Sequence, residues 1–174
     1  MSRNSRRQRR SRNRRSRKQR GSGFNNIRVQ TLRGGADAIR IMFGAQEVRN
    51  GQVVPLEQAQ QPFSFLIDGN PNDLYTVMIY DPDAVVPDYI HYFILNVKNS
   101  DPGKGNILYS YQPAAPPPGT GQHRYIVLVC KQREFIQPFV VPEGRAGASI
   151  DALLEGLRFE KMSHIIFLVD APAA

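Results

Sequence analysis

Two short stretches of this sequence hold side chains that could bind ions or transfer protons. In the first, YDPDA, Asp81 and Asp83 lie two residues apart, and Pro82 restricts the backbone between them. Residues i and i+2 of an extended chain share a face, so the sequence predicts that both carboxylates point the same way. Because neighbouring charged carboxylates repel each other, such a pair needs hydrogen-bond donors close by.

The second stretch, PPPGTGQHRY at residues 116–125, offers donors of that kind. Its glycines let the backbone turn tightly and expose amide groups. If a strand begins here, the side chains of His123 and Tyr125 share one face and Arg124 points away. A further imidazole, His91, stands at the head of another apolar run.

Together these groups predict one small cavity that binds an anion through imidazole, phenol and backbone amide donors. We expect the carboxylates to orient the imidazoles and to raise their pKa values. The expected members of the cavity are Asp81, Asp83, His91, His123 and Tyr125.

Each piece also has a simpler interpretation. A DPD sequence is most often only a turn, and a single histidine is usually structural, as we expect for His164 on its apolar run. The proline run is compatible with a polyproline ligand of an SH3-like partner, although no basic residue lies beside it.

The segments that must position these residues are short apolar runs separated by turn residues, the pattern of a β-rich domain. Several runs are apolar at almost every position, which predicts a sheet covered on both faces. One helix is expected, capped by Ser149. Its apolar stripe consists of Ile150, Leu153, Leu154 and Leu157. The candidate strands are residues 38–43, 63–67, 74–80, 91–97, 124–132 and 164–169.

The motifs DPDA, HYFILN and PPxGTGxHRY, in this order and spacing, resemble the phosphatidylethanolamine-binding protein family. The resemblance is close over about residues 38–135 and looser over the rest of the domain. It implies a mostly β fold with short helices, in which a large central antiparallel β-sheet is packed by a smaller sheet.

The resemblance also implies a function and a site. Members of the family act mainly as binding proteins that regulate kinases, proteases or transcription complexes, through a pocket for small anions and phosphoryl head groups. Two departures concern the pocket rim, where Val85 replaces a customary proline and residues 113–115 replace a glycine-containing stretch. Carried onto this sequence, the ligand-binding residues are Asp81, Asp83, His91, Pro117, His123 and Tyr125.

The formal net charge of +8 is unevenly distributed along the chain. Residues 1–20, which we call the arm, hold ten Arg, one Lys and no acid, whereas residues 21–174 carry 12 basic and 15 acidic residues. With no apolar residue after Met1 to bury, the arm is expected to be disordered and to join one domain, residues 24–174, through the Gly-Ser-Gly joint at 21–23. The residues expected to bind a polyanion are Arg6, Arg7, Arg9, Arg10, Arg12, Arg14, Arg15, Arg17, Lys18 and Arg20.

The partner of the arm stays open among RNA, DNA, an anionic membrane surface and a nuclear import receptor. Phosphate contacts alone position a protein without reading bases, so no sequence preference is expected. Phosphorylation of the serines in the four Ser-Arg pairs would nearly neutralise the arm, which makes these serines candidates for control.

Three function classes compete. The first is a regulatory binding protein whose pocket takes a small phosphate-containing ligand or a phosphorylated side chain. The second is a nucleic-acid-associated structural protein, of a virion or chromatin type, that uses the domain as a scaffold. The third is an enzyme, but no metal-ligand spacing such as HExxH and no nucleophile motif is present, so we predict no catalytic residue, cofactor or metal.

The remaining features concern the compartment. Cys130 is the only cysteine, which favours a reducing, intracellular location, and nuclear or virion-associated locations fit the arm. No apolar stretch is long enough for a membrane span. The composition of the arm matches a mitochondrial transit peptide, but it has no apolar face.

Overall fold

The computed structural model describes residues 38–98, 100–147 and 149–174; the arm and the joint lie outside these residues. The described chain is built mainly of strands. Its helices are α1 (Leu56–Ala59), the 3-10 helix η1 (Pro102–Lys104) and α2 (Ile150–Glu155). Its strands are β1 (Ala38–Phe43), β2 (Gln46–Val48), β3 (Gln52–Val53), β4 (Phe63–Asp68), β5 (Tyr75–Asp81), β6 (Tyr89–Val97), β7 (Asn106–Tyr109), β8 (Gln122–Gln132) and β9 (Phe159–Asp170).

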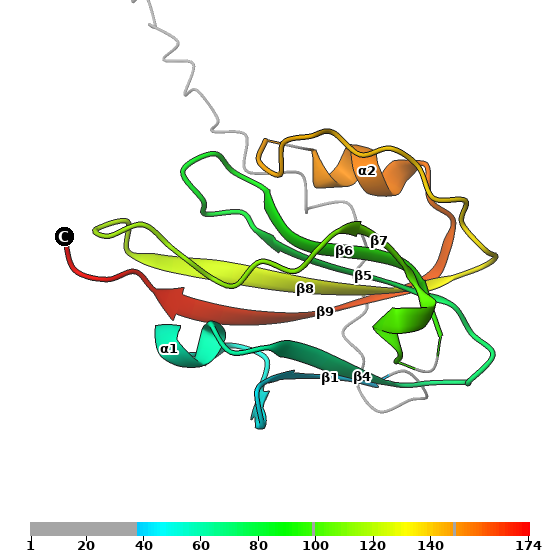
Figure 1. Cartoon of the computed structure of the whole chain (residues 1–174), viewed down its shortest axis with the longest axis horizontal. Coiled ribbons are helices and arrows are strands. Elements are labelled where there is room, and N and C mark those ends of the chain that lie inside the picture. The colour runs from blue at the N-terminus through cyan, green and yellow to red at the C-terminus, as the bar shows by residue number, and fades with distance from the viewer. Residues whose placement is uncertain (1–37, 99, 148) are drawn as a thin grey trace, which may run out of the picture.

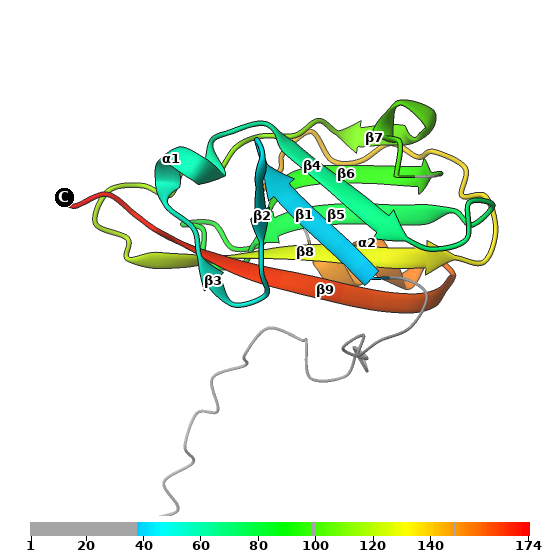
Figure 2. The same ribbon diagram turned by 90° about the horizontal axis from the view of Figure 1, so that it is seen from below.

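The strands form two sheets, a smaller one of order β2-β1-β4 and a larger one of order β3-β9-β8-β5-β6-β7. In Figure 2, β1 and β4 of the smaller sheet run across the strands of the larger one. The predicted fold class, mostly β with a large sheet packed by a smaller one, is confirmed. One pair departs from the expected antiparallel arrangement, because β3 runs parallel to β9.

The larger sheet is covered on both faces. The smaller sheet and α1 lie on one side, and α2 lies on the other (Figure 1). Strand β8 alternates accordingly: Tyr125, Val127 and Val129 belong to the hydrophobic cluster that includes residues of β1 and β4. Ile126, Leu128 and Cys130 belong to the cluster that includes residues of α2. This two-sided burial explains why the central runs are apolar at consecutive positions, as the sequence predicted.

The six candidate strands correspond to β1, β4, β5, β6, β8 and β9. Their ends shift by at most two residues, except that β9 begins five residues before its predicted start, and α2 ends before Leu157 of the predicted stripe. Helix α2 begins where predicted, and the Ser149 hydroxyl accepts a hydrogen bond from the Ala152 amide at 3.2 Å. Strands β2, β3 and β7 and helix α1 were missed, because segments of two to four residues carry no readable periodicity. Within the described ranges, no helix has the length and apolar character needed to cross a membrane.

Candidate anion-binding site

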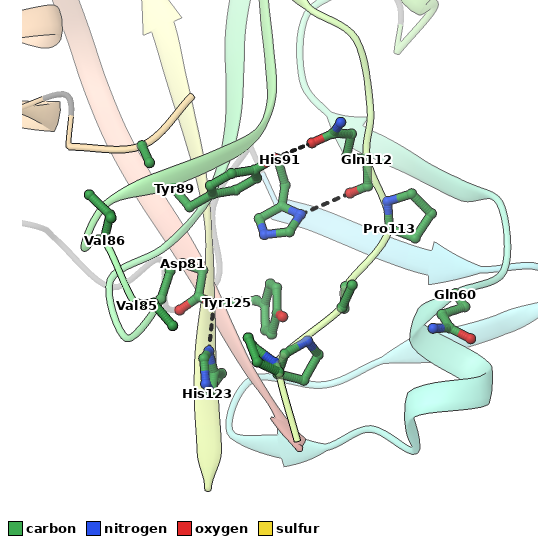
Figure 3. Close-up of a pocket in the computed structure, with 16 residues that line it drawn as sticks. Gln60, Asp81, Val85, Val86, Tyr89, His91, Gln112, Pro113, His123 and Tyr125 are labelled. Atoms are coloured by element: carbon green, nitrogen blue, oxygen red, sulfur yellow. Dashed lines mark hydrogen bonds and ion pairs between the residues drawn. The ribbon is translucent and has the colours of Figure 1, made fainter. Parts of the chain in front are cut away.

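A cavity of about 760 Å³ opens at one end of the larger sheet. Asp81 at the end of β5, His91 on β6, and His123 and Tyr125 on β8 line it, together with the loop between β7 and β8 (Figure 3). In an antiparallel sheet, the end of β5 lies beside the start of β6 and the start of β8, so residues far apart in the sequence meet at this edge. Pro117 lines the cavity from the loop.

Asp83 does not lie among the lining residues. The chain is extended only as far as Asp81, whose Oδ1 accepts a hydrogen bond from the Asp83 amide at 2.8 Å and so closes a turn. The Asp83 carboxylate instead accepts hydrogen bonds from the Arg124 side chain at 2.7 and 2.8 Å. The prediction that the two carboxylates point the same way was therefore wrong, because it assumed extended backbone through the turn. This pairing holds the pKa of Asp83 below its usual value.

Asp81 and His123 form a buried pair at the base of the cavity. Oδ2 of Asp81 lies 2.7 Å from Nδ1 of His123, and the two side chains are 4% and 1% exposed. The other ring nitrogen, Nε2, lies 2.8 Å from the Thr120 hydroxyl. That hydroxyl also lies 2.7 Å from the carbonyl oxygen of Pro117, to which it donates. Both nitrogens of His123 therefore face oxygen atoms of the protein, and the ring is held in the wall.

The row Asp81–His123–Thr120 has the connectivity of a nucleophile triad, but its geometry favours a structural role. The Thr120 hydroxyl proton is directed at the Pro117 carbonyl rather than at the imidazole. Thr120 is also absent from the cavity lining. His123 is 1% exposed and both of its ring nitrogens are held by protein oxygens, whereas a general base must reach the reacting group.

His91 presents its ring to the cavity in a defined state. Its Nδ1 lies 2.9 Å from the carbonyl oxygen of Gln112, and because a carbonyl can only accept, Nδ1 carries the proton. The ring is 6% exposed, and this burial lowers its pKa against the opposing effects of the Gln112 carbonyl and the Asp81 carboxylate. Asp81 thus acts in the expected direction on His91, but the net pKa is lowered because desolvation outweighs the carboxylate.

Aromatic and amide groups complete the polar wall. Tyr125 packs edge-on against His91, with ring centroids 5.1 Å apart, and stacks on Phe167 at the same centroid distance. The Tyr89 hydroxyl donates to the side-chain oxygen of Gln112 at 2.5 Å. Sequence reasoning missed Tyr89 and Gln112, although Tyr89 lies two residues before His91 on the same strand and so shares its face. Gln112 lies on the irregular loop between β7 and β8, which has no periodic sequence pattern from which its position could be predicted.

The mouth of the cavity is apolar. Val85 and Val86 line it and are 75% and 52% exposed, and they lie on the side of the cavity opposite Pro113 (Figure 3). Both departures noted in the sequence, at Val85 and at residues 113–115, therefore lie on the cavity wall.

In the part of the chain that the structure describes, no lysine or arginine lines the cavity. Arg145 lies nearby, and its Nη1 donates to the carbonyl oxygens of Ile90 and His91 at 3.0 and 3.4 Å. Its guanidinium also lies 5.1 Å from the centre of the Tyr109 ring. Within the described ranges, no cluster of three or more His, Cys, Asp or Glu side chains is arranged to hold a metal ion.

A fold of crossed sheets with a cavity at the strand ends, lined by a few buried polar side chains, defines a known class. A family model described as Phosphatidylethanolamine-binding protein matches residues 38–163, and the chain belongs to that family. The chain is 31% identical over 108 residues to "Protein MOTHER of FT and TFL1 homolog 2" of Oryza sativa subsp. japonica, and the match covers 58% of this chain and 61% of that protein.

Solved structures of low sequence identity share the fold. The carboxypeptidase Y inhibitor, solved in complex with its cognate proteinase, aligns with a TM-score of 0.65 and 17% identity over 78% of this chain and 84% of that one. The phosphatidylethanolamine-binding protein from Plasmodium vivax aligns with a TM-score of 0.64 and 16% identity over 85% of this chain and 90% of that one. At these identities the likeness concerns the fold alone.

Proposed function

We propose that the cavity binds a small phosphate-containing ligand, either a free molecule such as a phosphoryl head group or a phosphorylated side chain. The observation that carries this proposal is the convergence of Asp81, His91, His123 and Tyr125 on one cavity from three neighbouring strands. Membership of the phosphatidylethanolamine-binding protein family supports it. The protein acts by binding and by regulating a partner, without catalysis.

In the proposed complex the phosphoryl group lies against the imidazole of His91 and the side-chain amide of Gln112. The Gln112 oxygen already accepts from Tyr89, so its amide nitrogen is oriented as a donor. The buried Asp81–His123 pair shapes the wall behind them. The exposed valines at the mouth then contact the part of the ligand that extends outward.

The cavity proposal is tested with phosphoethanolamine in an NMR titration. We expect His91→Gln to weaken binding at least tenfold, because the variant removes the imidazole that faces the ligand. His164→Gln is the matched control, since His164 lies on β9 outside the cavity lining. Deletion of residues 1–20 should leave the affinity unchanged and excludes binding to the arm. Equal affinity of wild type and His91→Gln would refute the proposed site.

For the arm we propose binding of a polyanion, with nucleic acid as the leading candidate. We propose an intracellular, reducing location for the protein, and nuclear or virion-associated locations also fit the arm. The support is its charge, since all of the excess positive charge of the chain lies in residues 1–20 while residues 21–174 are net acidic. The arm and residues 24–174 are proposed as separate functional units.

The test of the arm is the salt dependence of duplex DNA and RNA binding. For duplex DNA, log K should fall with log salt by about 0.9 per phosphate contacted. Deletion of residues 1–20 should abolish binding, while His91→Gln should leave it unchanged. Retention of steep salt-dependent binding by the armless variant would contradict this division of roles.

A further inference from the structure

The protonation state of His91 determines whether its ring can donate a hydrogen bond to an anion in the cavity. Because Nδ1 donates to the Gln112 carbonyl, the neutral ring presents a lone pair at Nε2. A lone pair cannot donate to a phosphate oxygen and repels it. His123 cannot replace His91 as donor, because its two nitrogens face Asp81 and Thr120.

Among the described residues, no permanently charged side chain supplies a donor to the anion either. In the described ranges, no lysine or arginine lines the cavity, and His123 is paired with the Asp81 carboxylate. Arg145 interacts with backbone carbonyl oxygens outside the lining. Within the described lining, a proton taken up by His91 is therefore the charge that can offset a bound anion.

We propose that anion binding is coupled to the uptake of one proton from solvent by Nε2 of His91. This inference rests on the proposed function of the cavity and specifies how the site recognises its ligand. The protonated ring donates through Nδ1 to the Gln112 carbonyl and through Nε2 to the anion. No covalent bond other than the new N–H bond is made or broken.

The surroundings of His91 allow this change. Of the groups that face it, Asp81 on β5 favours the protonated ring, whereas Arg145, from the loop before α2, opposes it. Tyr89 on β6 and Tyr125 on β8 pack against the ring as uncharged aromatic groups, at centroid distances of 5.0 and 5.1 Å. Burial opposes the charge in the empty cavity, and an anion at contact distance reverses that balance.

Proton uptake makes affinity depend on pH in a defined direction. Between the pKa of His91 in the free protein and its higher pKa in the complex, affinity should rise tenfold for each unit by which pH falls. Dimethyl phosphate is the appropriate probe because it keeps one negative charge from about pH 5 to 8, whereas a phosphomonoester takes up its own proton near pH 6.

The experiment is an NMR titration of the full chain with dimethyl phosphate between pH 5 and 8, read at the ring nitrogens of His91. We expect a neutral ring protonated at Nδ1 in the free protein at pH 7, an imidazolium in the complex, and affinity that increases as pH falls. In His91→Gln the remaining affinity should be independent of pH, because an amide donates without ionising. His164→Gln should behave as wild type.

The outcomes separate the two proposals. Binding of equal affinity across the pH range, or a ring that stays neutral in the complex, would overturn proton coupling while leaving the cavity as the binding site. Absence of binding at every pH would overturn both. The wild-type spectra decide the question even if His91→Gln fails to fold.

Discussion

Replacing Asp81 should destabilise the protein far more than replacing Asp83, although the two residues belong to one short motif. The Asp81 side chain is 4% exposed and accepts from His123 at 2.7 Å and from the Asp83 amide at 2.8 Å. In Asp81→Ala the buried imidazole of His123 loses the carboxylate that pairs with its Nδ1. Breaking a buried pair in this way costs about 3–5 kcal/mol.

Asp83 pairs with Arg124 at the surface, where the two side chains are 30% and 52% exposed. Solvent screens such a pair, so its contribution is about 1 kcal/mol. It lies near the upper end of the usual range because Asp83 accepts from the Arg124 backbone amide as well as from two side-chain nitrogens. Asp83→Ala is therefore the internal control for the loss of a carboxylate in this motif.

Urea unfolding at pH 7, followed by far-UV circular dichroism because the chain has no tryptophan, measures both free energies. Each kcal/mol corresponds to about 2–4 °C in Tm for a chain of this size. Equal costs for the two variants, or a cost below about 1 kcal/mol for Asp81→Ala, would refute the assignment of a buried pair. If Asp81→Ala fails to fold, Asp81→Asn should show an intermediate loss, because its amide oxygen still accepts one hydrogen bond.

Two other perturbations follow from the structure. The unfolding free energy should fall as pH drops below about 6.5, because the unfolded chain takes up protons at the ordinary histidine pKa while burial holds the pKa of His91 and of His164 lower in the folded protein. Thermal melts between pH 7 and 5 measure this, and His91→Gln should flatten part of the slope; an unchanged slope would contradict it. Gly119→Ala should cost about 1–2 kcal/mol, because Gly119 has φ +76° and an added Cβ would lie 3.1 Å from that of Ala174. Gly144→Ala, with no heavy atom within 4 Å of its added Cβ, is the control in urea unfolding, and equal costs would count against the argument.

The elements of the fold that could be predicted were the strands with long apolar sequences. Strand β5 is buried at all seven positions, and its apolar sequence predicts a central strand covered on both faces. Strand β3, by contrast, spans Gln52–Val53, and its place in the larger sheet depends on pairing with Phe167 and Leu168. No local pattern encodes a partner so far away along the chain.

The same distinction applies to the cavity. Strand periodicity placed His123 and Tyr125 on one face, and the structure lines the cavity with both. The same strand periodicity failed at Asp83, because the Asp81 carboxylate accepts a hydrogen bond from the Asp83 amide and the strand ends at this turn. The net lowering of the His91 pKa was not predicted for a related reason, since the depth of burial depends on packing that a sequence pattern does not encode.

The position of β9 in the larger sheet has a consequence for synthesis. Strand β9 lies between β8 and β3, yet it is made after every other described strand. While the chain is still being translated, the eleven-residue β8 can pair with β5 but keeps its other edge open. An open apolar edge invites association between chains, so the interval before β9 is made is the one in which β8 is most exposed to aggregation.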